Sequence, residues 1–170
     1  MDNASVSYNW RMEFEERLRD RDTWEIGDRC SVARVMELLS TRTAFLVVRE
    51  CLYGTTRFED FVDRIDTSAP AVSRALKQLE AAGIITRVPY QEPGRRVRDE
   101  YRLTAAGRDL LPVILSMMHW GDAHLQEKGA PLTLVDRRTG RPVRVVVTAD
   151  DVRPIEPDDI EIRYTRQPLK

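Results

Sequence analysis

Hydrophobic residues recur every three or four positions through the first half of the chain, which is the spacing of one face of an α-helix. The pattern predicts four successive helices, over about residues 29–39, 42–53, 57–65 and 69–82. The residues before them, 1–28, are polar and rich in charge, and we expect them to form an N-terminal arm.

Cap signals mark the ends of these helices. Asp28 is a candidate N-cap of the first helix, and Gly54 is a suitable end for the second. The segment Thr56-Arg57-Phe58-Glu59 has the form of a capping box, which predicts the start of the third helix. Ser68 is a candidate N-cap of the fourth, and Pro70 is tolerated in its first turn. The third and fourth helices are therefore joined by a short turn.

The pattern changes after Gly83. Residues 84–88 and 97–103 are strand-like and flank turn residues, which predicts a two-stranded hairpin. Thr104 is then expected to cap a long helix over about residues 105–126, bent near its start by Pro112. Two more strands are predicted at 144–148 and 160–164. The expected fold class is mostly α, or α+β. Residues 29–128 form its main domain, and residues 129–170 form a small β-rich extension.

Helices followed by a hairpin in this order are typical of a winged helix-turn-helix. The major groove of DNA admits one α-helix, so one helix must project while the others support it. Because Val72, Leu76 and Leu79 face inward, helix 69–82 is expected in the major groove, with the wing at residues 89–98 on the backbone or minor groove. The candidate DNA contacts are Ser68, Ala69, Pro70, Ser73, Arg74, Lys77 and Gln78 in the helix, and Arg95, Arg96 and Arg98 in the wing.

Composition narrows the class without deciding the function. Hydrophobic residues make up 42% of the chain and charged residues 32%, as in folded globular proteins. No apolar run approaches the roughly 20 residues of a membrane span, and no signal peptide is visible, so we expect a cytoplasmic protein without a membrane partner. The net charge of −1 does not itself predict a nucleic-acid partner, although residues 69–102 are locally basic.

The stretch from Cys30 to Gly121 resembles the HxlR-type family of bacterial regulators. The matching pieces, in order, are Cys30, Arg49-Glu50, Gly54, Arg57-Phe58, Ser68, residues 76–85, Arg87, residues 100–107 and Trp120. The chain departs from the family at Arg42-Thr43, where Lys-Trp is usual, and the loop before Tyr101 is slightly longer.

This resemblance implies a sequence-specific transcription regulator, with repression the expected outcome. It further implies a homodimer, built from the first and last helices, that binds an inverted repeat in double-stranded DNA. The candidate dimer residues are Met117, Met118, Trp120 and Leu125.

The two cysteines are too few for a disulfide framework or a zinc ribbon. Cys30 occupies a position where some members of the family carry a redox-sensing thiol, and the alternative is a small buried packing residue. His119 and His124 are five residues apart, so they do not share a helical face, and we expect no metal site. The sequence shows no Gly-rich phosphate loop and no persuasive catalytic triad, so we expect neither a cofactor nor an enzyme.

Two other functional classes stay open. One is a ligand-responsive or redox-responsive sensor, in which the last helix or the segment after Gly129 binds a small-molecule effector. The other is a winged helix used for protein contacts, with little DNA specificity of its own. The acidic residues near the C-terminus could also mask the arginines of the wing.

Overall fold

The structure is a computed structural model that describes residues 11–165. The chain forms two compact units, residues 1–37 and 38–170. The described part of the first unit contains the short 3-10 helices η1 (Glu16–Leu18), η2 (Arg21–Thr23) and η3 (Gly27–Arg29), followed by α1 (Ser31–Leu38), which ends in the second unit. The predicted cap at Asp28 is wrong: Asp28 lies inside η3, and the extended backbone of Cys30 separates η3 from α1.

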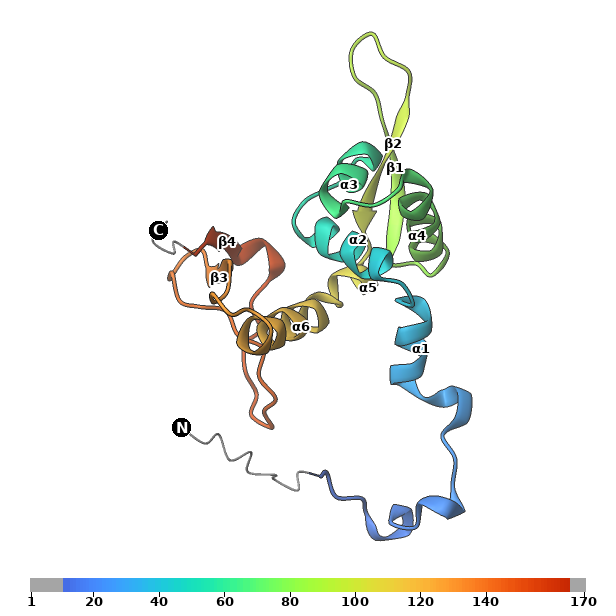
Figure 1. The fold of residues 1–170 in the computed structure, drawn as a ribbon, viewed down its shortest axis with the longest axis vertical. Coiled ribbons are helices and arrows are strands. Elements are labelled where there is room, and N and C mark those ends of the chain that lie inside the picture. The colour runs from blue at the N-terminus through green and yellow to red at the C-terminus, as the bar shows by residue number, and fades with distance from the viewer. Residues whose placement is uncertain (1–10, 166–170) are drawn as a thin grey trace. The chain divides into compact units, whose positions relative to one another are not determined.

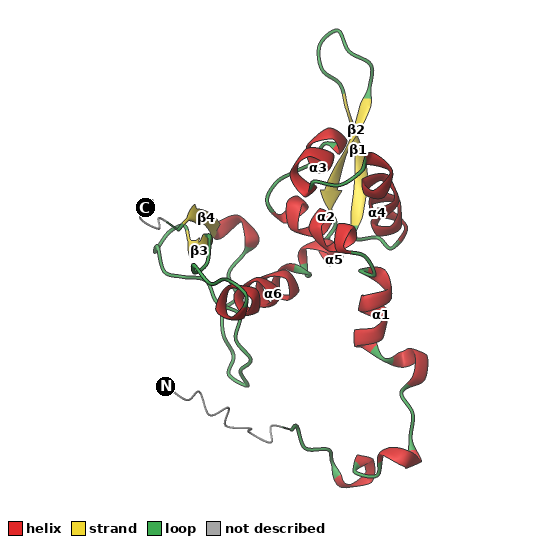
Figure 2. Ribbon diagram, in the orientation of Figure 1, coloured by secondary structure: helices red, strands yellow, loops and turns green. Residues whose placement is uncertain are grey.

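The second unit begins with three helices and a hairpin (Figures 1 and 2), which confirms the predicted winged helix-turn-helix. The helices are α2 (Arg42–Leu52), α3 (Phe58–Ile65) and α4 (Ala69–Ala81). The strands β1 (Ile85–Tyr90) and β2 (Arg98–Leu103) pair antiparallel, and Figure 2 shows a long loop between them. The largest fully buried side chains come from all three helices and β1: Val47, Val48, Phe61, Val72, Leu76, Leu79 and Ile85.

The segment between α2 and α3 is tied to the hairpin. The predicted capping box is wrong, because Arg57 occupies the N-cap position of α3 and makes no side-chain cap bond. The carbonyl of Thr56 instead accepts a hydrogen bond of 2.7 Å from the amide of Tyr101 in β2. Thr56 therefore joins the base of the wing to the helices, a long-range role that its local sequence does not reveal.

The helix expected over residues 105–126 is divided into α5 (Ala105–Arg108) and α6 (Leu111–His124). Thr104 caps α5 by accepting a hydrogen bond from the amide of Gly107, as predicted. Its hydroxyl also donates to the Gly83 carbonyl at 2.6 Å. Pro112 lies at the start of α6, where its missing amide is tolerated, so it begins a new helix and does not bend a continuous one.

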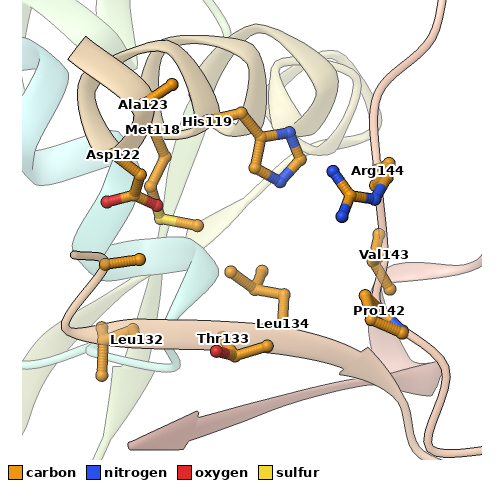
Figure 3. A pocket seen from close by; sticks show the side chains of 11 residues that line it. Met118, His119, Asp122, Ala123, Leu132, Thr133, Leu134, Pro142, Val143 and Arg144 are labelled. Atoms are coloured by element: carbon orange, nitrogen blue, oxygen red, sulfur yellow. The ribbon is translucent and has the colours of Figure 1, made fainter. Parts of the chain in front are cut away.

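The extension is a small β-structure beside α6. Strand β3 (Leu132–Asp136) pairs antiparallel with β4 (Ile160–Tyr164), and η4 (Pro157–Asp159) precedes β4. Figure 3 shows β3 facing α6. Strand 160–164 is confirmed, but the strand predicted at 144–148 is wrong: that segment is a loop with exposed Val146 and Val147. The partner of β4 is β3, because burial of Leu134 and Val135 stabilises the strand there.

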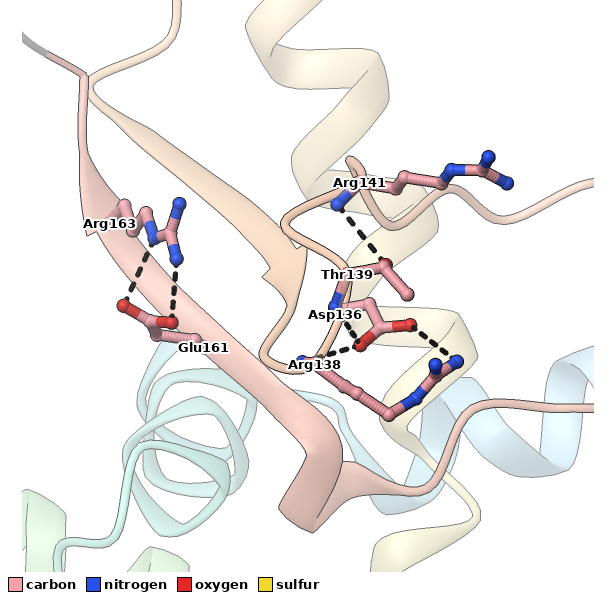
Figure 4. Close-up of polar contacts among 6 residues, drawn as sticks. All are labelled: Asp136, Arg138, Thr139, Arg141, Glu161 and Arg163. Atoms are coloured by element: carbon pink, nitrogen blue, oxygen red, sulfur yellow. Dashed lines mark hydrogen bonds and ion pairs between the residues drawn. The ribbon is translucent and has the colours of Figure 1, made fainter.

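The turn after β3 is held by Asp136 (Figure 4). Its carboxylate accepts hydrogen bonds from the amides of Arg138 at 2.7 Å and Thr139 at 3.1 Å. Hydrogen bonds from Thr139, followed by the Arg138 amide and charge, lower the pKa of Asp136. The turn returns the chain along β3, where the Val143 amide donates to the Leu134 carbonyl at 2.8 Å. This places residues 142–144 close to α6.

Candidate nucleic-acid interface

The turn between α3 and α4 sets the direction of the candidate reading helix. Asp66 ends α3 in the left-handed conformation, with φ of 52°. Ser68 has the N-cap position of α4, and its carbonyl accepts from the amides of Ala71 and Val72. The Ser68 hydroxyl does not form the expected capping hydrogen bond with an amide of α4. It is exposed instead, beside Ala69 and Pro70, so this end of α4 faces solvent.

Helix α4 has one buried face and one exposed face. Val72, Leu76 and Leu79 are buried as predicted, while Arg74 and Lys77 are exposed on the other side and Ser73 is partly exposed. Because the buried stripe attaches α4 to the core, these three polar side chains are the ones positioned to meet a ligand.

Gln78 differs from the expectation that it lies with the DNA-facing residues. Its side-chain amide donates to the Leu38 carbonyl at 2.7 Å, and it lies 3.5 Å from the Ser40 hydroxyl. Leu38 is the last residue of α1, and a terminal carbonyl has no partner within its own helix. The long side chain of Gln78 therefore satisfies the end of another helix.

The arginines of the wing differ in how closely an acidic side chain approaches them. Gly94, Arg95, Arg96 and Arg98 line a shallow cavity of about 370 Å³, and all three arginines are exposed. Arg98 forms an ion pair with Glu59 of α3, so its charge is partly neutralised. Arg95 lies 3.9 Å from Glu92, a weaker contact. The cavity has no acidic lining residue, which makes it suitable for an anion.

Arg57 is a positioning residue that the candidate DNA contacts did not include. Its guanidinium lies 4.9 Å from the centre of the Tyr90 ring and 2.9 Å from the Glu92 carboxylate. Tyr90 ends β1 and Glu92 lies in the wing loop just after it, so Arg57 holds the base of the wing against the start of α3. The only sequence signal was the Arg57-Phe58 pair within the family resemblance.

The four candidate dimer residues do not share one environment. Met117 and Trp120 of α6 and Leu125 at its C-cap have exposed fractions of 54, 59 and 69%. Met118 is partly buried instead, and the Tyr53 hydroxyl lies 3.6 Å from its sulfur. In the first unit, Val32 and Met36 of α1 are also exposed.

The two thiols lie in different surroundings. Both cysteines are partly exposed, Cys30 just before α1 and Cys51 in α2. Burial, aided by the charge of Glu50, raises the pKa of Cys51 to about 12. The raised pKa makes Cys51 a poor nucleophile at neutral pH.

Two other kinds of site were sought over residues 11–165. No three His, Cys, Asp or Glu side chains gather there in a way that would hold a metal ion. No helix in the same residues is long and apolar enough to cross a membrane.

Comparison with known proteins assigns the family. The HxlR-like helix-turn-helix family matches residues 38–129. The chain belongs to this family. An uncharacterized HTH-type transcriptional regulator of Mycobacterium bovis is 39% identical over 105 residues, which is 61% of this chain and 65% of that relative. This HxlR-like chain thus spans just under two thirds of the length of that relative.

Two solved structures resemble the HxlR-like chain beyond sequence. PA1607, described as a transcription factor, superposes with a TM-score of 0.65 at 29% identity, covering 84% of this chain and 98% of its own. The covered share of this chain is larger than the part that precedes the extension, residues 1–129, so the similarity includes part of the extension. The redox regulator HypR in its reduced form gives a TM-score of 0.51 at 26% identity, covering 56% of this chain and 93% of its own.

Proposed function

We propose that this protein is a transcription regulator that binds double-stranded DNA as a homodimer. Helix α4 lies in the major groove, and the wing at residues 89–98 contacts the backbone or the minor groove. The observation that carries the proposal is the polar face of α4, where Arg74 and Lys77 are exposed opposite a fully buried stripe.

The two basic elements contribute differently to binding. Of the two exposed cations of α4, Arg74 is the nearer to its N-terminal end, from which recognition helices reach base edges. The arginine-lined cavity of the wing suits a phosphate, because guanidinium groups bind phosphate oxygens in pairs. The helix then supplies base preference, and the wing supplies sequence-independent affinity.

The homodimer rests on exposed apolar residues. Met117 and Trp120 on α6, Leu125 at its C-cap, and Val32 and Met36 on α1 exceed the isolated exposed apolar residues that a monomer normally tolerates. Two-fold pairing predicts an inverted repeat whose half-sites are about one helical turn apart, or a multiple of that distance. Occupying a promoter in this way would repress transcription.

Fluorescence anisotropy with DNA from upstream of the protein's own gene tests the proposal. Arg74→Ala should relax preference at one base pair, at a cost of about 1–3 kcal/mol. Lys77→Ala should weaken binding to every DNA sequence similarly. It should also reduce the slope of log affinity against log salt concentration by about one unit. Arg163→Ala is the matched control, because Arg163 is an exposed cation paired with Glu161 in the extension. Equal effects of all three substitutions would contradict the assignment of α4.

A redox response at Cys30 is the second candidate. It is favoured by the partly exposed, free thiol at the start of α1 and by the similarity to HypR. Cys30→Ser should abolish any change in DNA affinity caused by diamide. A Cys30→Ser variant that still responds to diamide would exclude this role.

A further inference from the structure

A cavity of about 320 Å³ lies between α6 and the extension. Met118, His119 and Asp122 line it from α6, Leu134 lines it from β3, and Arg144 lines it from the loop beyond Pro142 (Figure 3). This volume is at the lower end of those that hold small organic ligands. The cavity is separate from α4 and the wing, so the DNA-binding surface does not account for it.

The polar groups of the cavity converge from opposite walls. Figure 3 shows the imidazole of His119 and the guanidinium of Arg144 directed toward the same space. The side chain of Arg144 forms no ion pair and no hydrogen bond with any residue in the described range. A guanidinium without a carboxylate partner is a ready site for an anion, since it binds carboxylates in bidentate geometry.

The rest of the lining sets the shape of the ligand. Met118 and Leu134 place a thioether and an aliphatic side chain in the cavity, and thioethers pack well against aromatic rings. Asp122 lines the same cavity, and its negative charge opposes any acidic group that Arg144 does not hold. The complement is therefore an apolar body that carries a single carboxylate.

We propose that this cavity binds a small organic monocarboxylic acid. Arg144 holds the carboxylate, the N–H of the His119 imidazole donates a second hydrogen bond, and Met118 and Leu134 pack against the apolar body. The ligand bridges α6 and the loop at residues 142–144, which line opposite sides of the cavity.

The regulatory part of this inference rests on the proposed function. Helix α6 presents Met117 and Trp120 on the surface proposed for the dimer. His119, which lines the cavity, lies between these two residues in the sequence. A ligand that fixes α6 against the extension shifts the population of dimer geometries. Because half-site spacing depends on that geometry, ligand binding changes DNA affinity.

Isothermal titration calorimetry on the full chain, without DNA, tests the site. The probes are 2-naphthoate, the neutral 2-naphthalenemethanol and 2,6-naphthalenedicarboxylate. We expect 2-naphthoate to bind at least tenfold more tightly than either of the others. Arg144→Gln should weaken the binding of 2-naphthoate by about tenfold or more, since a charge-assisted hydrogen bond is lost. Arg163→Gln, in the same extension, should leave its affinity unchanged.

Equal affinity for 2-naphthoate and the alcohol, or unchanged affinity in Arg144→Gln, would overturn the site. Arg144 is exposed, so loss of folding does not explain a loss of binding, and His119→Gln provides a second variant within the cavity. Saturating 2-naphthoate should change DNA affinity in the wild type but not in Arg144→Gln. If the acid binds and DNA affinity does not change, the regulatory step is wrong and the site stands. If no DNA binds at all, the proposed function fails independently.

Discussion

Gly107 is the position where a single added methyl group should be most damaging. It is buried in α5, and a Cβ atom there would overlap the carbonyl oxygen of Ile84 and lie 2.8 Å from Cδ2 of Leu103. Both neighbours are at the base of the hairpin, so neither can move without disturbing the core. Gly107→Ala must therefore displace α5 from the start of β1.

The size of the effect follows from two contributions. Overpacking in a well-packed interior costs about 1–3 kcal/mol. Displacing α5 also weakens two hydrogen bonds, one from the Thr104 hydroxyl to the Gly83 carbonyl and one from the Thr104 amide to the Ile84 carbonyl, each worth about 1 kcal/mol. We therefore expect Gly107→Ala to lower the free energy of unfolding by about 2–5 kcal/mol.

Urea unfolding followed by far-UV circular dichroism measures this loss, with the m-value expected to stay constant. Gly121→Ala is the matched control, because Gly121 lies in α6 with no atom near the position of its Cβ. It should stabilise the protein by about 0.5–1 kcal/mol, through the better helix propensity of alanine. A Gly107→Ala variant within about 0.5 kcal/mol of wild type would refute the close packing of α5 on β1.

Two further predictions concern the wing and the thiols. Glu59→Gln removes the partner of Arg98, so DNA affinity at low salt should rise by up to about fivefold, as expected for an exposed ion pair. Asp60→Asn makes the same charge change at the neighbouring exposed position of α3, and an equal rise in DNA affinity with this variant in anisotropy titrations would contradict a specific role for Glu59. Because the pKa of the Cys51 thiol is about 12, almost no thiolate is present at pH 8. Mass spectrometry should find iodoacetamide on Cys30 in the folded protein and on Cys51 only after unfolding, and similar labelling rates would contradict the burial of Cys51.

The helices of the winged domain could be predicted because their signals are local. The spacing of Val72, Leu76 and Leu79 defines the buried side of α4 within four turns, and this also identifies Arg74 and Lys77 as exposed. Thr104 was similarly identifiable, since its cap partner is three residues away.

The features that were missed depend on residues far apart in the chain. Arg98 was expected to be available at the wing, but its partner Glu59 is 39 residues earlier. Met118 has the same helical pattern as its neighbours, yet its sulfur contacts the hydroxyl of Tyr53, 65 residues away in the chain. Strand β3 is only five residues long, and the valine-rich loop at 144–148 has a stronger local strand pattern but lacks a pairing partner.

The hydrogen bond from Gln78 to the end of α1 has a practical consequence for altering operator preference. A combinatorial library for new targets would naturally randomise every polar position on the exposed side of α4. Within the described residues, the side chains of Ser73, Arg74 and Lys77 make no such bond to another helix. The Gln78 side chain, in contrast, donates to the Leu38 carbonyl at the end of α1. Holding Gln78 constant removes poorly folded members from the library and leaves the diversity at the positions that face outward.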